Sequence, residues 1–178
     1  MDLVKEARKG TEAAFLRLFD EHHLPLFRFA YRLTGSTPDA EDIVQECFLE
    51  LLRPRCSYDS RRTSIRTYLF GVIRNQCLKR WRKNASATCD GPETSYERSP
   101  ESDILHAEMK EIIRRAVREL PETQREVLIL AHYEQMPFAE IAGVLEIEVA
   151  AVKSRLQRAR AQLKETLAAY APGEGRKR

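Results

Sequence analysis

The sequence lacks several features that define common classes of protein. It has no run of about 18 apolar residues, so we expect no transmembrane helix. Its first fifteen residues, MDLVKEARKGTEAAF, carry neither an apolar signal core nor a cleavage-site pattern, so we expect the chain to stay in the cytoplasm. HExxH, GxSxG and glycine-rich phosphate-binding motifs are missing, and the four histidines are scattered. These absences argue against a metal-dependent or hydrolytic enzyme and predict no catalytic site and no cofactor.

Cysteine is scarce as well. The chain has four cysteines, Cys47, Cys56, Cys77 and Cys89, which form no CxxC pair. A reducing compartment disfavours disulfides between them. Cys47 and Cys77 fall within helical patterns, which is typical of small core side chains. A zinc site built from Cys56, Cys89 and a histidine would lack the usual ligand spacing, so no metal site is predicted.

Signals for β-strands are also absent. There is no sustained alternation of polar and apolar residues and no Asn-Gly hairpin turn, whereas apolar residues recur at helical spacing. The pattern therefore predicts an all-α fold. After a short first helix that ends near residue 10, the predicted helices cover about 11–34, 38–53, 64–83, 104–120, 122–133, 138–145 and 149–170.

Glycine and proline mark the expected ends of the first long helices. Gly35 is predicted to end one helix, Thr37 to cap the next, and Pro38 to occupy its first turn. Pro25 lies inside an apolar stripe. We therefore predict a kink or a break at Pro25, because proline removes a helical hydrogen bond.

One stretch has the composition of a linker. Residues 84–103, NASATCDGPETSYERSPESD, contain no large aliphatic side chain. Charged residues make up 32% of the chain, which suits two small domains with much surface. We predict two helical domains joined by a flexible linker: an N-terminal domain at 1–84, the linker at 85–103, a C-terminal domain at 104–171 and a disordered tail at 172–178.

The segment FAEIAGVLEIEVAAVKSRLQRAR, residues 138–160, has the internal pattern of a helix-turn-helix. Apolar residues at helical spacing would form the inner faces of two short helices joined by a tight turn. They are Ile141, Ala142, Leu145, Ile147, Val149, Val152 and Leu156. We predict that the second of these helices enters the major groove of DNA.

The outward face of that second helix suits DNA. If Val152 and Leu156 point inward, the residues that point outward or flank this face are Lys153, Ser154, Arg155, Gln157, Arg158 and Arg160. These side chains can bond base edges or phosphates. The alternative interpretation is an ordinary surface helix with solvated charges.

Two glutamates depart from the usual pattern of this motif. Glu146 stands where the turn usually has a glycine, and Glu148 stands where the second helix usually begins with Ser, Thr or Pro. A glutamate suits the positive end of a helix dipole, but it would also lie near DNA phosphates. We therefore expect weak DNA binding by this domain alone.

Charge is segregated within the N-terminal domain. Residues 36–52 contain no Lys or Arg, and their acids are Asp39, Glu41, Asp42, Glu46 and Glu50. Two interpretations remain open for this helix: a solvated surface helix with acids at its positive end, or a docking helix for a basic partner.

The next stretch has the opposite sign. Residues 53–83 carry ten Lys or Arg residues and one acid, Asp59, with Tyr58, Tyr68, Phe70 and Trp81 interleaved. Cations attract phosphates and aromatic faces stack on exposed bases, so this stretch suits single-stranded or locally melted DNA. The alternative for Tyr68 and Phe70 is a place in the core.

Together these segments resemble a known family. The chain is similar to the group 4, or extracytoplasmic-function (ECF), members of the sigma-70 family of RNA polymerase sigma factors. DAEDIVQECFLEL resembles the family's segment that docks on the clamp helices of the polymerase, and SIRTYLFGVIRNQCLKRWRK resembles the segment that melts and reads the minus-ten promoter element. Residues 117–163 resemble the minus-thirty-five reader. The three segments occur in the family's order with a polar linker between the second and the third.

The resemblance implies roles for individual residues. The implied contacts to the polymerase clamp are Asp39, Asp42, Gln45 and Glu46. The loop 58–64 would hold a flipped-out base, and the implied minus-ten residues are Tyr58, Arg61, Arg62, Asn75, Lys79 and Arg80. The implied minus-thirty-five residues are Lys153, Ser154, Arg155, Gln157 and Arg158. The family usually has a tryptophan at the position of Tyr68, and often a Phe and a Gly within the stretch 59–62.

The implied function is that of an alternative sigma factor. It would bind core RNA polymerase, recognise promoter DNA at the minus-ten and minus-thirty-five elements, melt it and start transcription. We expect a monomer when free, with an anti-sigma factor as a further partner that the family suggests. The alternative is a polymerase-independent helix-turn-helix regulator that binds a symmetric operator as a dimer. The acidic helix and the unsymmetrical basic face argue against that alternative.

Overall fold

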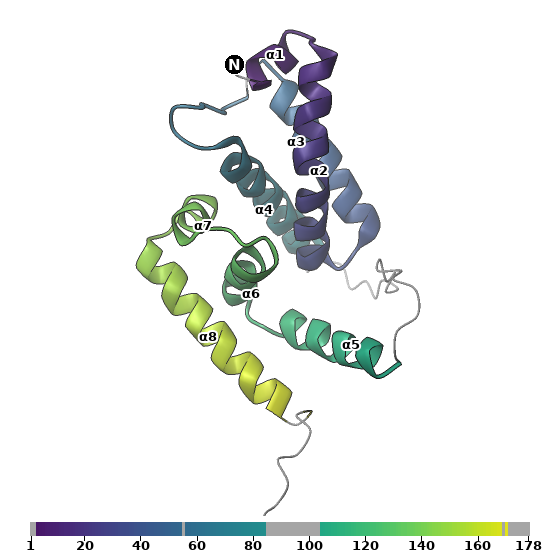
Figure 1. The fold of residues 1–178 in the computed structure, drawn as a ribbon, viewed down its shortest axis with the longest axis vertical. Coiled ribbons are helices and arrows are strands. Elements are labelled where there is room, and N and C mark those ends of the chain that lie inside the picture. The colour runs from purple at the N-terminus through teal and green to yellow at the C-terminus, as the bar shows by residue number, and fades with distance from the viewer. Residues whose placement is uncertain (1–2, 55, 85–103, 169, 171–178) are drawn as a thin grey trace, which may run out of the picture.

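The computed structural model describes residues 3–54, 56–84, 104–168 and 170, and its regular elements in these ranges are all helices (Figure 1). They are α1 (Leu3–Arg8), α2 (Glu12–Thr34), α3 (Thr37–Leu52), α4 (Ile65–Asn84), α5 (Ile104–Arg118), α6 (Glu122–Leu128), η1 (Ile129–Tyr133), α7 (Phe138–Leu145) and α8 (Val149–Ala168). The all-α prediction is confirmed. The predicted linker and tail, and Cys89 with them, lie outside the described residues.

The four N-terminal helices pack around the apolar stripes that the sequence showed. Leu26 and Phe29 of α2 are fully buried together with Ile43 of α3 and Phe70 of α4. The rings of Phe29 and Phe70 lie 5.2 Å apart at their centroids. Phe70 is therefore a core residue and not part of an exposed aromatic face. This core fixes α3 and α4 side by side and so positions both charged segments.

The helix α2 runs through Pro25 without a break, so of the two predicted alternatives, a kink or a break, the break is wrong. A proline inside a helix removes one backbone hydrogen bond, and the many remaining bonds of this 23-residue helix keep it intact. Burial of the apolar residues on both sides of Pro25, Leu18 and Leu26 among them, holds the two halves on the same core.

The junction between α2 and α3 follows the predicted signals with one correction. Gly35 adopts a left-handed conformation with φ 71°, and its N–H donates to the carbonyl oxygen of Tyr31 at 2.8 Å. The cap of α3 is Ser36 and not Thr37, because the Ser36 Oγ accepts from the N–H of Asp39 at 3.3 Å. Thr37 and Pro38 occupy the first turn of the helix.

The C-terminal helices lie at the predicted positions, but one of them differs in its type of helix. The expected helix over 122–133 is α6 followed by a five-residue π-helix, η1. The helix-turn-helix pair forms as predicted, since α7 ends at Leu145 and α8 begins at Val149. Val152, Leu156 and Ala159 of α8 are buried against α6 and α7.

The two groups of helices do not stand apart. Figure 1 shows α4 between them, with α7 packed directly against it. The helix α2 also contacts η1. Buried apolar residues of both groups therefore belong to one continuous cluster. In the part of the chain that the structure describes, no helix is long and apolar enough to cross a membrane.

Candidate nucleic-acid and polymerase interface

The outward face of α3 carries the predicted docking residues. Asp42, Gln45 and Glu46 are exposed, and Leu49 one turn further along is 53% exposed. Asp39, at the start of the helix, is half-buried. The opposite face of α3 holds the core residues Ile43, Val44, Cys47, Phe48 and Leu51. The helical period thus separates a buried apolar face from a polar face that ends in an exposed leucine.

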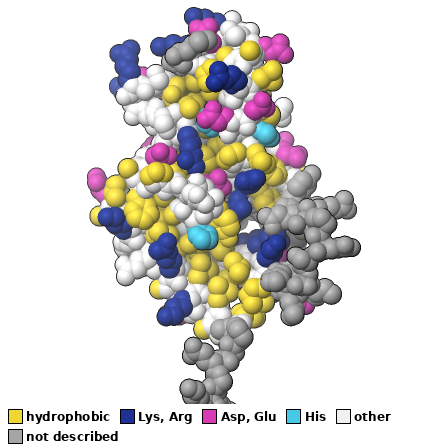
Figure 2. Space-filling view, viewed as in Figure 1, with side chains coloured by type: hydrophobic (Ala, Val, Ile, Leu, Met, Phe, Trp, Pro, Cys, Tyr) yellow, Lys and Arg dark blue, Asp and Glu magenta, His cyan; other side chains and the backbone are white. Residues whose placement is uncertain are grey.

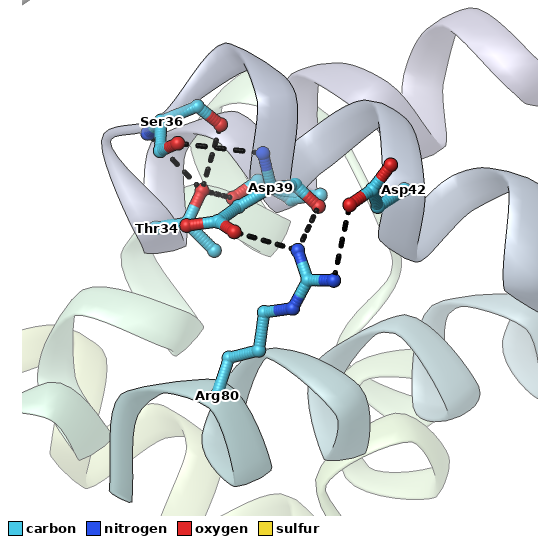
Figure 3. A network of polar contacts seen from close by, with 6 residues as sticks. Thr34, Ser36, Asp39, Asp42 and Arg80 are labelled. Carbon is cyan, nitrogen blue, oxygen red and sulfur yellow. Dashed lines mark hydrogen bonds and ion pairs between the residues drawn. The ribbon is translucent and has the colours of Figure 1, made fainter. Parts of the chain in front are cut away.

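Arg80 of α4 joins the two predicted interfaces (Figure 3). Its Nη1 donates to Asp39 Oδ1 at 2.6 Å, and its Nη2 donates to Asp42 Oδ2 at 3.2 Å. Nη1 also lies 3.3 Å from the backbone oxygen of Asp39. A predicted DNA-binding residue is therefore paired with two predicted polymerase-binding residues. Sequence patterns could not indicate this bridge, because 38 and 41 residues separate the partners.

An apolar groove lies beside the docking residues. It has a volume of about 610 Å³, and its lining includes Phe19, Phe27, Phe48 and Leu49 with Gln45 at its edge. Phe19 and Phe27 belong to the apolar stripe that surrounds Pro25. The structure leaves Phe19 and Phe27 half-buried and open to this groove. The groove could have been predicted from the width of this apolar stripe, because the stripe has more large side chains than one face of a helix can bury.

The predicted base-holding loop is built around two tyrosines. Tyr58 packs on Tyr68 with 5.2 Å between the ring centroids. The Tyr68 hydroxyl lies 3.2 Å from the Cys56 Sγ and 3.5 Å from the Ser57 Oγ. Burial raises the pKa of Tyr68 to about 12, so the hydroxyl is neutral at pH 7. Tyr68 is half-buried and contacts the loop through Tyr58, Cys56 and Ser57.

The outer part of that loop is ordered by an aspartate. The N–H of Arg61 donates to Asp59 Oδ1 at 3.0 Å, which is the local turn that aspartate favours. The Nε of Arg62 lies 3.7 Å from Asp59 Oδ2. Both arginine side chains are exposed. The loop therefore presents two cations to solvent beside Tyr58.

The helix α4 divides its residues between the core and a polar cleft. Ile73 and Cys77 are buried, whereas Asn75 and Lys79 are exposed and line a cleft of about 720 Å³. Glu46 of α3 and Arg80 line the same cleft, so the structure brings these predicted residues together. Further along the helix, Trp81 is 55% exposed. An exposed tryptophan can stack on an unpaired base.

The helix-turn-helix has the geometry that its sequence predicts. Glu146 takes the left-handed conformation expected of a glycine, with φ 55° and ψ 45°. The N–H of Ile147 then bonds the carbonyl oxygen of Ala142 at 3.1 Å and closes the turn. A glutamate can stand in this turn because the left-handed conformation is allowed to all residues at a modest cost.

The outward face of α8 matches the prediction with two exceptions. Lys153, Gln157 and Arg158 are exposed, whereas Ser154 and Arg155 are only half-exposed. The Arg158 Nη2 donates to the Ser154 Oγ at 2.9 Å, and the charge of Arg155 acts on Glu126 of α6. In the space-filling view, basic side chains are the main charged groups over the lower part of the molecule, where α5 and α8 lie (Figure 2).

Comparison with known proteins identifies the same two regions. Residues 18–87 match the family model for sigma-70 region 2, and residues 110–163 match that for sigma-70 region 4. The chain is 35% identical over 164 residues to the ECF RNA polymerase sigma factor SigL of Mycobacterium tuberculosis, covering 89% of this chain and 92% of SigL. It is 29% identical over 177 residues to the ECF RNA polymerase sigma factor SigW of Bacillus subtilis, covering 92% of this chain and 94% of SigW.

A solved structure shares the fold. CnrH, determined in complex with the cytosolic domain of CnrY, aligns with a TM-score of 0.72 and 26% identity, over 94% of this chain and 96% of CnrH. Proteins of this family are initiation factors and not enzymes. Both family regions, in the same order and covering most of the chain, show that this protein belongs to the ECF group of sigma-70 family sigma factors, which direct RNA polymerase to promoters and initiate transcription.

Proposed function

We propose that this sigma factor divides its task between its two groups of helices. Residues 1–84 dock on core polymerase and read the minus-ten element, and residues 104–171 read the minus-thirty-five element. Residues 85–103 connect them, and 172–178 form a tail. The observation that carries this proposal is the exposed acidic face of α3 next to the exposed Asn75, Lys79 and Trp81 of α4, with a second exposed basic face on α8.

The docking step would combine charge and apolar burial. Asp39, Asp42, Gln45 and Glu46 offer carboxylates and an amide to a basic partner surface. Leu49 and the adjacent apolar groove offer a place for an apolar side chain of that partner. Such a patch, with an apolar centre and a polar rim, has the composition of a protein interface.

The minus-ten step would use the basic loop and the cleft of α4. Arg61, Arg62 and Lys79 supply cations for the phosphates, and Asn75 supplies an amide for a base edge. Tyr58 and the exposed Trp81 supply aromatic faces on which unpaired bases stack, at about 1–3 kcal/mol per base. These contacts would offset the cost of unstacking the duplex.

The minus-thirty-five step would use the outward face of α8 in the major groove. Lys153, Gln157 and Arg158 point toward solvent from one face, with Ser154 and Arg155 beside them. One polymerase assembly holds both readers, so each raises the effective concentration of the other. Two weak readers can therefore act together as one specific reader.

Further partners and the site of action follow from the family. CnrH is known as a complex with the cytosolic domain of CnrY, so at least one relative of this chain binds a partner protein. We infer that an anti-sigma factor regulates this chain, that the chain acts in the cytoplasm where its polymerase is, and that it is a monomer when free.

Run-off transcription with purified bacterial core polymerase on a library of promoter fragments tests the proposal. We expect discrete start sites that depend on this protein and that are lost when Asp42→Lys and Glu46→Lys are combined. The matched control combines Asp20→Lys with Glu119→Lys, which reverses two exposed acids away from α3 and should leave transcription unchanged. Tight binding to a palindromic duplex without polymerase, together with no binding to core polymerase, would support the conventional regulator instead.

A further inference from the structure

A cavity lined by α2, α5 and η1 lies apart from the proposed polymerase and DNA contacts. Its volume is about 600 Å³, which is within the range of about 300–1,000 Å³ that is usual for small-molecule sites. Figure 1 shows α5 near the C-terminal end of α2, and both helices line the cavity. The residues named above as polymerase or DNA contacts do not line it, and only Leu24 and Phe27 also border the apolar groove. The proposed function therefore does not account for this cavity.

Positive charge surrounds the cavity. The cations that line it are Arg28, Arg32, Lys110, Arg114 and Arg118, and no acid is among the described residues of its lining. Arg28 and Lys110 are exposed, and the described part of the chain supplies no ion-pair partner for either. Like charges gathered around one cavity repel one another, and a bound anion would relieve this repulsion.

The cations stand in a row on each of the two helices. On α2, Arg28 and Arg32 are four residues apart, and the same spacing separates the cavity-lining cations of α5, which are Lys110, Arg114 and Arg118. Side chains four residues apart lie on one face of a helix, and like charges at this spacing destabilise it. Each helix thus accepts an unfavourable charge pattern on the face that lines the cavity.

Two of these cations are bonded to carboxylates beside the cavity. The Nη1 of Arg32 lies 3.6 Å from Glu134 Oε1, and the Nη1 of Arg114 donates to Glu111 Oε2 at 3.1 Å. These carboxylates fix the two guanidinium groups, but neither carboxylate lines the cavity. An arginine that is already oriented can still donate its remaining N–H groups to an anion, because a guanidinium carries five.

The rest of the lining is apolar, and much of it is aromatic. Phe27 and Tyr31 of α2 stack with 6.3 Å between their ring centroids and 11° between their planes. Ile113 and Val117 of α5 form an aliphatic row beside the cations of that helix. Aromatic faces stack on planar bases, whereas guanidinium groups bond phosphates. The cavity thus offers both kinds of contact to one ligand.

Two further rings come from the π-helical turn. In η1 the N–H of Glu134 bonds the carbonyl oxygen of Ile129, five residues earlier, at 3.2 Å. His132 and Tyr133 both line the cavity, with 5.4 Å between their ring centroids, and Tyr133 is 38% exposed. Single π-helical turns inside helical segments occur frequently at functional sites. An imidazole N–H can also donate to a phosphate oxygen.

We propose that this cavity binds a nucleoside polyphosphate. The cation rows hold the phosphates, and the aromatic side chains stack on the base. An apolar ligand would leave the cations without a counter-charge, and an inorganic anion would leave the rings unused. The inference goes beyond the proposed function, because it does not depend on polymerase or promoter DNA. The ligand contacts both groups of helices and so stabilises the folded protein.

Competition for a fluorescent nucleotide tests the proposal on the free, full-length protein. Anisotropy is measured for ATP that carries an N-methylanthraniloyl group, and ATP, GTP, tripolyphosphate, adenosine or polyglutamate is added as competitor. We expect ATP and GTP to displace the probe at least about fivefold better than tripolyphosphate, because stacking of the base contributes, and adenosine to displace it least.

Three outcomes of this competition would overturn the proposal. The first is that the probe does not bind. The second is that tripolyphosphate displaces the probe as well as ATP does, which would indicate an anion site without a base. The third is that polyglutamate displaces the probe and ATP does not, which would indicate a docking surface for an acidic protein segment. None of these measurements needs polymerase, so their result is independent of run-off transcription.

A pair of charge-matched variants locates the site. Arg28→Ala with Lys110→Ala removes one exposed cation from each row, and we expect the affinity for labelled ATP to fall at least about tenfold. The control, Arg17→Ala with Arg115→Ala, removes one exposed cation from each of the same helices outside the cavity and should bind as wild type does. Equal losses in both variants would mean a general charge effect and would overturn the proposal.

Tyr133→Leu tests the contact with the base. We expect the affinity for ATP to fall at least about fivefold while the affinity for tripolyphosphate stays unchanged. Circular dichroism checks that the variants are folded. Excess ATP should also raise the unfolding temperature of wild type and not that of the Arg28→Ala, Lys110→Ala variant. An equal rise in both proteins would place nucleotide binding elsewhere and overturn the proposal.

Discussion

The two helices proposed to face DNA, α4 and α8, carry similar charges but use them differently. In α4 the arginines Arg66, Arg74 and Arg80 are all bonded to acceptors elsewhere in the protein. In α8 the exposed Lys153 and Arg158 face solvent, and Arg158 bonds only within its own helix, to Ser154. From the sequence alone, both helices are equally suited to bind a polyanion such as DNA. The structure shows that α8 presents Lys153 and Arg158 to solvent, whereas the three arginines of α4 would first have to leave partners elsewhere in the protein.

Cysteine alkylation distinguishes the buried inner faces of α3 and α4 from the half-exposed loop between these helices. Burial raises the pKa of Cys47 and of Cys77 from the usual 9.0 to about 12, so at pH 8 their reactive thiolate fraction falls about 1,000-fold. In a Cys89→Ser protein, we expect iodoacetamide to label half-exposed Cys56 and to spare Cys47 and Cys77 until denaturant is added. Mass spectrometry of the labelled peptides gives the answer, and rapid native labelling of Cys77 would mean that the inner face of α4 is open.

Removing the buried partner of an α4 arginine should lower the free energy of unfolding strongly, whereas truncating an exposed arginine of α8 should change it little. Glu126→Ala leaves Arg74 without its partner at the interface, and we expect a loss of about 3 kcal/mol in the free energy of unfolding. The same substitution at exposed Arg158 should change that free energy by less than about 0.5 kcal/mol. Urea denaturation of both variants tests the contrast.

A paired replacement supplies the control for this loss. Arg74→Met with Glu126→Leu should recover most of the stability, because apolar residues of similar size can replace a buried ion pair. If the double variant is as unstable as Glu126→Ala, the loss comes from packing within the C-terminal group and not from the unpaired arginine.

Binding to the minus-thirty-five duplex should depend on the α8 cations. For Lys153→Ala and for Arg158→Ala we expect a loss of about 1–2 kcal/mol in the free energy of binding. If a residue contacts a phosphate, the slope of log affinity against log salt should also fall by about one unit. Fluorescence anisotropy at several salt concentrations, with polymerase present, distinguishes the two contact types. Unchanged affinity in both variants would exclude this face of α8 as the reader.

The smallest expected effect concerns the turn before α8. Glu146 has φ 55°, where glycine has no steric penalty, so Glu146→Gly should raise the free energy of unfolding by about 0.5–1 kcal/mol. The variant also removes a negative charge next to the proposed DNA surface. Thermal unfolding measures the first effect, and Glu146→Gln, which keeps the strain and removes the charge, separates it from the second. No gain for glycine over glutamine would show that the turn is unstrained.

Local features of this fold were predictable because they depend on near neighbours in the chain. The stop at Gly35, the bounds of α7 and the inner face of α8 all follow from helical period and turn chemistry. The cap at Ser36 was missed because Ser36 and Thr37 are both capping types, and the backbone conformation decides which of them caps the helix. The break that was one of two alternatives at Pro25 does not occur, because tertiary packing outweighs one lost hydrogen bond.

Features that join distant segments could not be predicted. The Arg74–Glu126 pair spans 52 residues, and the Arg66–Glu134 bond spans 68. The number of arginines in the basic stretch 53–83 does not show which acceptor each arginine bonds or how deeply its side chain is buried. Exposed residues of α8, such as Lys153 and Arg158, were correctly expected to be outward, because the helical period depends only on their buried neighbours.

The position of Arg80 couples the two proposed interfaces thermodynamically. The guanidinium that bridges Asp39 and Asp42 cannot give the same bonds to a phosphate at the same time. A polymerase surface that attracts those carboxylates makes Arg80 available to DNA, and DNA that attracts Arg80 leaves the carboxylates to the polymerase. Linkage requires the two effects to be equal in free energy, so each macromolecule strengthens the binding of the other by the same factor. One side chain can thereby make assembly on the promoter cooperative.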